Sequence, residues 1–341
     1  MSFFHFDFLQ RTGTLAILLG VLVLVSLIAA GAGAYWIPPL QIPGIILNEG
    51  DDYGVLMHVR FPRVVLGVIV GACLGIAGAS LQGLFRNPLA DPGLIGVSAG
   101  AGLGASIWIV LLGSVFPAVG QWGITCSAFA GAGVITYCAW KLANVQHMIS
   151  TVHLLLAGVA FSSLAGACIG LLTVLSTDEQ LRNLTFWMLG SLSSATWTHV
   201  LVAAVVGAMG MMTLLPLGRP LNLLSLGESD AYHLGVNTRQ INYRVILGST
   251  LAVGAAVSTA GGIGFIGLVI PHLLRMFIGP DHRFLLPGSA LLGATLLVGS
   301  DLTARTIAAP LEIPVGVITA FFGAPFFLGL VWRQRREFSY A

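Results

Sequence analysis

Charged residues are what this sequence has least of. Asp, Glu, Lys and Arg make up 8% of its 341 residues, whereas soluble domains carry about 25%. Hydrophobic residues make up 56%, and the mean hydropathy is +0.93. This is the composition of a polytopic membrane protein, which has lipid around it. The sequence has no basic tract to bind nucleic acid and no low-complexity linker. We therefore expect one transmembrane domain over residues 1–341 and no nucleic-acid partner.

Cysteine is also scarce. Each of the four cysteines lies alone in an apolar run, which is typical of small buried side chains and not of disulfides or C-x-x-C metal sites. The eight histidines are scattered, and none has a metal-ligating partner at helical spacing. We therefore expect no resident metal and no cofactor. The cysteines are Cys73, Cys126, Cys138 and Cys168.

Patterns of catalytic residues are missing as well. The sequence contains no Ser/His/Asp order, no H-E-x-x-H, no paired carboxylates and no phosphate-binding loop, so no catalytic residues are expected and the chain is predicted not to be an enzyme. An ion-driven carrier usually needs ionisable groups near the bilayer midplane. Here Asp301, Arg305 and Glu312 cluster near the ends of apolar runs instead. The energy for transport should therefore come from another protein.

Ten apolar runs, bounded by charge, glycine and proline, predict an all-α protein with ten transmembrane helices. The first run is too long for a signal-peptide core. Ten spans put both termini on one side. If that side is cytoplasmic, eleven Lys and Arg residues lie inside and four outside, so the positive-inside rule places both termini in the cytoplasm. The predicted spans are residues 14–36, 63–84, 93–112, 117–140, 152–174, 193–215, 243–262, 264–279, 285–304 and 314–332.

The second span carries a ladder of small residues at every fourth position. Such a ladder lines one helix face, along which a neighbouring backbone can approach closely. A second ladder over residues 248–264, and five identities at an offset of 183 residues, predict an inverted repeat of the kind transporters use. A chance match between two helices rich in glycine and alanine is the alternative. The first ladder consists of Gly67, Gly71, Gly75, Ala79 and Gly83.

After the second span the chain forms a polar, proline-bearing turn over residues 86–92. This block resembles the signature region of the FecCD-type permeases, the subunits of ABC transporters that import iron–siderophore complexes, haem and vitamin B12. The family pattern is R-x-P-R, then a glycine-rich helix, then Q-x-x-x-x-N-P-L-A-x-P-x-x-x-G-x-x-x-G-A. In this chain the pattern is carried by Arg60, Pro62, Arg63, Gln82, Asn87, Pro88, Leu89, Ala90, Pro92, Gly96, Gly100 and Ala101.

Further blocks follow in family order: residues 264–275 with Pro271, then 281–283, 312–316 and 323–327. The resemblance covers nearly the whole chain and implies a type II ABC importer permease in the bacterial cytoplasmic membrane. It also implies a homodimer or a heterodimer with a related permease. The implied partners are two copies of a cytoplasmic ATPase and a periplasmic or lipid-anchored substrate-binding protein. The implied cargo is an iron chelate, either an iron–siderophore complex or haem.

The longest polar stretch between the later spans is residues 217–243. It faces the cytoplasm in this topology and should form two short helices, with Ser225 as a candidate cap and Gly235 as a stop. Loops this long usually carry function, although a plain connection is the alternative. In the resembled family this segment docks into the ATPase. The family pattern G-E…A-x-x-L-G is met by Gly227, Glu228, Ala231, Leu234 and Gly235.

On the predicted outer face, basic residues are rarer than acidic ones, and all of the basic residues are arginines. Arg60, Arg63 and Arg305 match the family positions that meet glutamates on the substrate-binding protein, so the resemblance assigns them to docking. Arginine forks bind carboxylates bidentately, and exposed charge pairs set orientation and on-rate more than affinity. Helix-end arginines that extend toward lipid headgroups are the alternative.

A short inner loop, residues 141–153, precedes the fifth span. In the family the corresponding Ser-Thr pair narrows the cytoplasmic exit, which assigns Ser150 and Thr151 to a gate. An ordinary helix cap is the alternative, and one residue pair can serve both purposes.

Two other functions stay open at this point. The sequence does not separate an iron chelate from cobalamin, because the binding protein chooses the substrate in such systems. A secondary carrier from another class is the more distant alternative. That carrier would be driven by an ion gradient and would have no ATPase partner.

Overall fold

The protein, seen in a computed structural model that describes residues 8–33, 35–145, 148–149 and 151–339, is a bundle of helices. Seven helices in the described residues are long and apolar enough to span a membrane, and three shorter apolar helices accompany them. Each predicted span is a helix, so this prediction is confirmed. The ten are α1 (Phe8–Gly31), α4 (Phe61–Phe85), α5 (Val97–Ile107), α6 (Gln121–Ala143), α7 (Thr151–Leu175), α9 (Trp197–Leu214), α12 (Thr238–Ala260), α13 (Ile266–Ile278), α14 (His282–Thr306) and α15 (Val315–Ser339).

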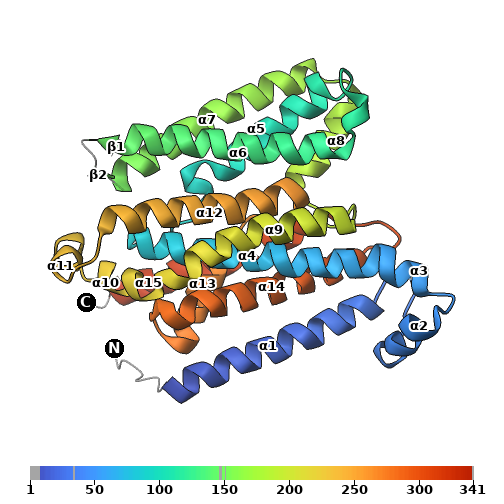
Figure 1. Cartoon of the computed structure of the whole chain (residues 1–341), viewed down its shortest axis with the longest axis horizontal. Helices are drawn as coiled ribbons and strands as arrows, with labels where there is room; N and C mark the ends of the chain where they lie inside the picture. The colour runs from blue at the N-terminus through green and yellow to red at the C-terminus, as the bar shows by residue number, and fades with distance from the viewer. Residues whose placement is uncertain (1–7, 34, 146–147, 150, 340–341) are drawn as a thin grey trace.

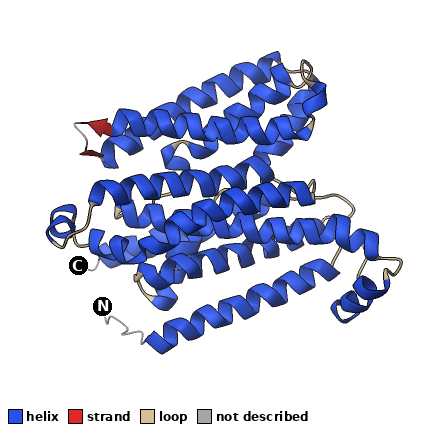
Figure 2. Cartoon of the chain, in the orientation of Figure 1, coloured by secondary structure: helices blue, strands red, loops and turns tan. Residues whose placement is uncertain are grey.

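Short elements join these helices. One pair of two-residue strands, β1 (Asn144–Val145) and β2 (Met148–Ile149), forms an antiparallel hairpin between α6 and α7. Figure 2 shows how small this hairpin is beside the helices. The short helices are α2 (Ile42–Asn48), α3 (Tyr53–Val55), α8 (Asp178–Leu189), α10 (Gly218–Leu224) and α11 (Glu228–His233).

Successive long helices run in alternating directions, so α1 begins and α15 ends at the same end of the bundle (Figure 1). We call this end, which also holds α10, α11 and the hairpin, the terminal end. We call the opposite end, which holds α2, α3 and α8, the distal end (Figure 1). Helices α4 and α12 run in opposite directions (Figure 1), which is the arrangement an inverted repeat requires. The repeat itself stays a prediction.

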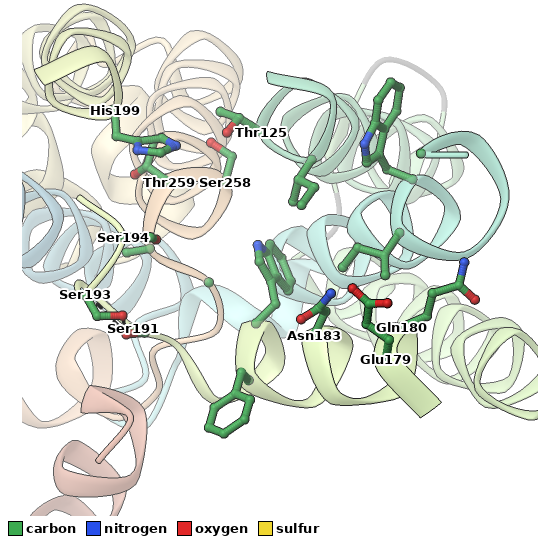
Figure 3. A pocket seen from close by; sticks show the side chains of 18 of the residues that line it. Thr125, Glu179, Gln180, Asn183, Ser191, Ser193, Ser194, His199, Ser258 and Thr259 are labelled. Carbon is green, nitrogen blue, oxygen red and sulfur yellow. Dashed lines mark hydrogen bonds between the residues drawn. The ribbon is translucent and has the colours of Figure 1, made fainter. Parts of the chain in front are cut away.

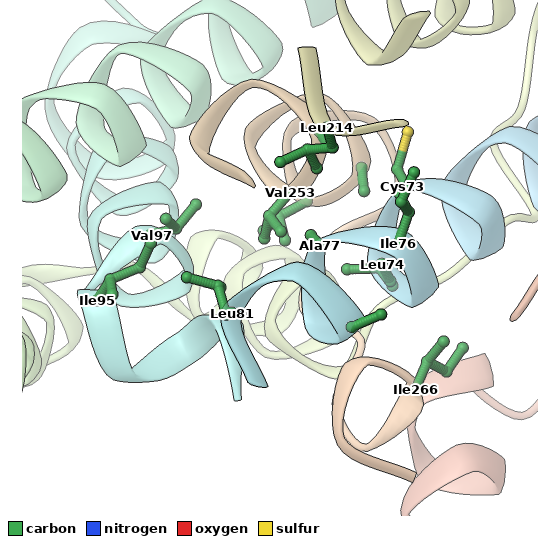
Figure 4. Packing of buried hydrophobic residues seen from close by; sticks show 14 of the residues in the cluster. Cys73, Leu74, Ile76, Ala77, Leu81, Ile95, Val97, Leu214, Val253 and Ile266 are labelled. Carbon is green, nitrogen blue, oxygen red and sulfur yellow. The ribbon is translucent and has the colours of Figure 1, made fainter. Parts of the chain in front are cut away.

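Helix α4 lies at the centre of the packing. Its buried Cys73, Ile76 and Leu81 pack among apolar side chains of α9, α12, α13 and the start of α5 (Figure 4). Bilayer lipid supplies no hydrophobic drive between helices, so close backbone approach at small residues does much of the work of association. The small-residue ladder supplies such an approach on the side of α4 that faces α14, where Gly71 and Gly75 meet backbone atoms of Gly293 and Ser289.

Two glycines of α4 lie close to α13 and α14: Gly75 of the ladder, and Gly78 beside it. A Cβ atom added at Gly75 would overlap the carbonyl oxygen of Ser289 in α14, and one added at Gly78 would overlap that of Gly267 in α13. Pro271 lies one turn after Gly267 inside α13 and has no N–H to donate to that carbonyl. The Gly267 carbonyl, which lacks its usual donor four residues on, is the group that faces Gly78.

The outermost helices are apolar on their exposed faces. Helices α1 and α7 are the least buried of the long helices, as expected for surfaces that lie against lipid or a second subunit. The prediction that all four cysteines are buried is wrong in part. Cys73 is buried, but Cys126 and Cys168 are exposed on the single chain. Thiols are tolerated in lipid, so an apolar run by itself does not reveal which side of the helix faces the core.

Candidate functional site

At the distal end, Arg63 is held by two carboxylates. Its Nε donates to both carboxylate oxygens of Asp301 at 3.0 Å, and its Nη1 donates to Glu312 at 2.9 Å. The side chains of Arg63 and Asp301 are 7% and 3% exposed, whereas that of Glu312 is 45% exposed. The pair joins the start of α4 to the end of α14. The predicted cluster of Asp301, Arg305 and Glu312 at the span ends is thus confirmed.

The other two arginines of this end bind backbone carbonyls. Arg60 donates to the carbonyl oxygens of Ala30 and Gly31, the last two residues of α1, and of Tyr35, which follows the helix. Arg305 donates to the carbonyl of Ala29 at 2.6 Å and lies 3.6 Å from Asp301. The carbonyls of Ala29 and Ala30 belong to the last turn of α1, where carbonyls have no partner within the helix, so the guanidinium donors satisfy them.

Arg60, Arg63 and Arg305 therefore lie together, as the resemblance implies, but they are buried. The expectation of exposed charge pairs is wrong for them, since each residue is less than 8% exposed. The sequence shows the arginines but not the internal acceptors, because those are backbone carbonyls and carboxylates far along the chain. Their assignment to docking stays a prediction.

The last turns of α4, which precede the signature turn, are tied to α13 by Gln82. Gln82 is buried and donates from Nε2 to the carbonyl of Leu268 at 3.1 Å, while Arg275 donates to Gln82 Oε1 at 2.7 Å. Asn87 accepts a hydrogen bond from the backbone N–H of Leu89 at 2.9 Å, a local turn that asparagine favours. The exposed Pro88 completes this turn.

Pro92 opens the short 3-10 helix that leads to α5. It is buried, and a Cβ added at Gly267 would lie 2.8 Å from its Cδ. Gln82 and Pro92 thus both pack on the first turns of α13, and Pro271 is buried in the same helix. The motif residues from distant parts of the sequence meet in one place and are structural there.

At the terminal end, residues 217–243 form the two predicted short helices, α10 and α11. Gly227 caps α11 with a φ of +132°, and Gly235 ends it with a φ of +82°, values that glycine adopts easily. Ala231 is fully buried, whereas Leu234 is 59% exposed. Ser225, the candidate cap, lies at the C-cap position of α10, where its hydroxyl donates to the carbonyl of Asn222.

The exposed side of α11 also bears Tyr232, which is 70% exposed. Glu228 lies 4.0 Å from Arg86 of the signature turn. An apolar group with a charged neighbour, displayed at the end of a membrane bundle, is the usual make-up of a surface that another protein covers.

Helix α10 is fastened to the start of α14 by Asn222. Its amide donates to Asp281 at 2.6 Å, and its oxygen accepts from the backbone N–H of His282 at 2.8 Å. Asp281 also accepts from Arg11 of α1 and from Arg283. Burial alone would raise the pKa of Asp281, but the hydrogen bonds from Arg283 and Asn222 outweigh it and lower that pKa to about 2. The family block 281–283 marked Asp281 and Arg283 in the sequence, but nothing there indicated that Asn222 and Arg11 join them.

Of the two predicted gate residues, the structure describes one. Thr151 is the first residue of α7, at the terminal end, and Ser150 lies outside the described residues. The gate assignment stays a prediction. No group of three or more His, Cys, Asp or Glu side chains that could hold a metal occurs in the part of the chain that the structure describes.

A cavity of about 770 Å³ lies at the distal end between α8 and the ends of α9 and α12. Helix α8 was not predicted from the sequence, although the sequence contains its capping box. The Thr177 side chain accepts a hydrogen bond from the backbone N–H of Gln180, and the Gln180 side chain accepts one from the backbone N–H of Thr177. Gln180 also donates to the carbonyl of Val110 in the π-helical segment Trp108–Leu112, which follows α5. Figure 3 shows Glu179 and Asn183 on α8 across the cavity from Ser258 and His199.

Comparisons with known proteins agree with this arrangement. The sequence profile of the FecCD transport family matches residues 19–333. The hemin transport system permease protein of Yersinia pestis is 44% identical over 95% of this chain and 97% of its own length. The vitamin B12 import system permease protein of Vibrio vulnificus is 39% identical over 94% of each chain.

A solved structure is similar as well. It is that of a metal-chelate type ABC transporter in an inward-facing conformation. It matches with a TM-score of 0.81 and 34% identity, over 94% of this chain and 99% of its own.

Proposed function

The chain belongs to the FecCD transport family, and on that premise we propose that it is the permease subunit of an ABC importer that carries an iron chelate across the cytoplasmic membrane. The chelate is an iron–siderophore complex or haem. Hydrolysis of ATP is the task of a separate subunit.

The observation that carries this proposal is the pairing of a membrane bundle with the exposed α10–α11 segment. That segment is fixed to α14 through Asn222 and to α1 through Asp281, so a push on it is passed to helices that cross the whole bundle. It displays Tyr232 and Leu234 to a partner. We propose that this partner is a cytoplasmic ATPase in two copies, which places the terminal end in the cytoplasm and makes Gly227, Glu228, Ala231, Leu234 and Gly235 the coupling residues.

At the distal end we propose that a periplasmic or lipid-anchored substrate-binding protein docks. Arg63 is the arginine best placed to take part, because its partner Glu312 is half exposed and can be exchanged for a carboxylate of the binding protein. Arg60 and Arg305 would shape this surface through the end of α1. Two copies of the chain, or this chain with a related permease, would form the pathway, with Ser150 and Thr151 at its inner exit.

Cobalamin is the second candidate cargo. The relatives include vitamin B12 permeases as well as the hemin permease. Their sequence identities to this chain are too similar to decide between the two cargoes. An ion-driven carrier is disfavoured by family membership.

The test is purification of the tagged chain from native membranes, followed by reconstitution. We expect an ABC ATPase and a substrate-binding protein to copurify, and uptake of the chelate into proteoliposomes to require ATP. Uptake by the chain alone, without nucleotide and driven by an ion gradient, would overturn the proposal. In docking assays, Arg63→Gln should weaken binding-protein association at low salt. A parallel thermal melt distinguishes this effect from loss of the fold.

A further inference from the structure

Arg63 divides its guanidinium between two carboxylates that differ in exposure. Its Nε and Nη2 each lie 3.0 Å from Asp301, and its Nη1 donates to Glu312 at 2.9 Å. The side chain of Asp301 is 3% exposed, whereas that of Glu312 is 45% exposed. A buried carboxylate is strongly destabilised when its cation is removed, but water can replace the cation at an exposed one. Glu312 is therefore the partner that Arg63 can exchange.

Glu312 lies in the turn of residues 307–314, which joins α14 to α15. Most side chains of this turn are exposed, so few of them fix its position by packing. Among the described residues, Arg63 is the only side chain that donates a hydrogen bond to Glu312. The backbone N–H of Ile313 also bonds to the carbonyl of Ala304 in α14, at 3.3 Å. The ion pair with Arg63 is thus a main connection between the turn and the bundle.

The turn leads directly into α15, whose first residue is the buried Val315. A Cβ atom added at Gly316 would overlap the carbonyl oxygen of Leu189, the last residue of α8. The first turn of α15 therefore lies against the backbone at the end of α8 with no side chain between them. A displacement of the turn is passed to α15 and, through this contact, to α8.

We propose that Glu312 is a displaceable latch. It occupies the edge of Arg63 that a carboxylate of the docked substrate-binding protein takes, and its displacement releases the turn of residues 307–314 and the start of α15. This inference rests on the proposed function and deepens it. It assigns the residue whose release links docking at the distal end to movement of α15 and α8.

The first test measures equilibrium binding of the copurified substrate-binding protein to the permease–ATPase complex in lipid nanodiscs at low salt. Glu312→Gln should tighten binding by about threefold or more, because the internal competitor for Arg63 loses its charge. Glu49→Gln removes the same charge from an exposed position at the end of α2 and should leave the affinity unchanged. A residue that only supports the fold would give weaker or unchanged binding when replaced. Either of these results for Glu312→Gln, or an equal gain in both variants, would refute the latch.

A second pair of variants shows whether the competition is for Arg63. In a chain that carries Arg63→Gln, the further substitution Glu312→Gln should change the affinity little, because no cation is left to compete for. An undiminished gain in this background would mean that Glu312 merely repels the partner, which contradicts the latch. Thermal melts show which variants are folded, and the first test does not depend on Arg63→Gln.

Hydrogen exchange of the chain without any partner tests the hold on the turn. The amides of residues 307–314 should exchange at least about twofold faster in Glu312→Gln than in the wild type, because the turn has lost its ion pair. In Glu49→Gln they should exchange at the wild-type rate. If Glu312→Gln also exchanges at the wild-type rate, Glu312 does not hold the turn and the inference is wrong.

The outcome is separable from that of the proposed function. If the binding protein docks, and Glu312→Gln neither tightens docking nor loosens the turn, the latch fails and the permease function stands. If no substrate-binding protein associates with the wild-type complex, the proposed docking surface fails and the latch fails with it.

Discussion

Among single residues, the buried arginines of the distal end do the most to define the local structure. Arg60, Arg63 and Arg305 are buried, and each donates hydrogen bonds to carbonyl or carboxylate oxygens of other segments of the chain. An unsatisfied carbonyl or carboxylate in such surroundings costs several kcal/mol. Arginine suits this place because it presents five donors on one rigid fork and keeps its charge.

Removal of Arg63 tests this role. We expect Arg63→Met to lower the free energy of unfolding by about 3–5 kcal/mol, because the buried Asp301 loses its two hydrogen bonds and keeps only the more distant Arg305, 3.6 Å away. The double variant Arg63→Met with Asp301→Leu should regain part of this loss. The measurement is unfolding of the detergent-solubilised chain. Arg182→Met, at an exposed position of α8, is the matched control and should change little. A loss no larger than that of the control would contradict the role.

Asp281 makes the stability of the terminal end depend on pH. Its pKa is about 2 in the folded chain against an ordinary value of 3.8, so folding favours the ionised form. This contribution is full above the ordinary value and is lost as the pH falls through the folded value. We expect the Tm of Asp281→Asn to lie below that of the wild type at pH 6 and the gap to shrink between pH 4 and pH 2. Thermal melts across this range are the measurement. A gap that stays constant would mean that ionisation of Asp281 is not involved.

Between elements, the contact of α4 with α13 and α14 depends on the absence of side chains. Gly71, Gly75 and Gly78 let backbones meet where a methyl group would overlap a carbonyl. The result is a rigid core of three helices with the signature turn attached to it through Gln82. We therefore expect the outer helices, and not the helices of this core, to move during transport.

The prediction for this contact is a pair of glycine substitutions. Gly78→Ala should destabilise the chain by about 1–3 kcal/mol, because the added methyl group forces α4 and α13 apart. Gly299→Ala in α14 has nothing within 4 Å of its added Cβ and should be neutral or slightly stabilising, since alanine favours helix. Unfolding of both variants in the same detergent compares them. Equal stability of the two variants would contradict the close approach.

For the whole molecule, the two ends of the bundle are built for different neighbours. The terminal end displays α11 with Tyr232 and Leu234, and the distal end displays the cavity and the half-exposed Glu312. The helices between them run the full length of the bundle (Figure 1). A permease driven by a partner on one face and supplied by a partner on the other needs this division.

Association with the ATPase provides the test at this scale. Leu234→Asp should weaken copurification of the ATPase by about tenfold, because a charge replaces an apolar contact at the proposed interface. Leu40→Asp, 96% exposed near α2 at the distal end, should leave it unchanged. Quantitative pull-down from native membranes measures both. If the two variants retain equal amounts of ATPase, α11 is not the coupling surface.

The sequence alone determined the number of spans, the glycine-lined face of α4 and the two short helices before α12. These features follow from hydropathy, from four-residue spacing and from glycines that local backbone geometry requires, all of which are local in the chain. It also carried the family resemblance, because the motif residues occur in a fixed order.

Only the tertiary structure decided which charges are free. Arg63 and Asp301 are 238 residues apart in the chain, and Asp281 gathers Arg11 and Asn222 from two other helices. The cavity, too, exists only because α8 folds back across the ends of α9 and α12. Partners and cavities of this kind arise from how helices pack, and that packing depends on contacts between residues far apart in sequence, which no local pattern encodes.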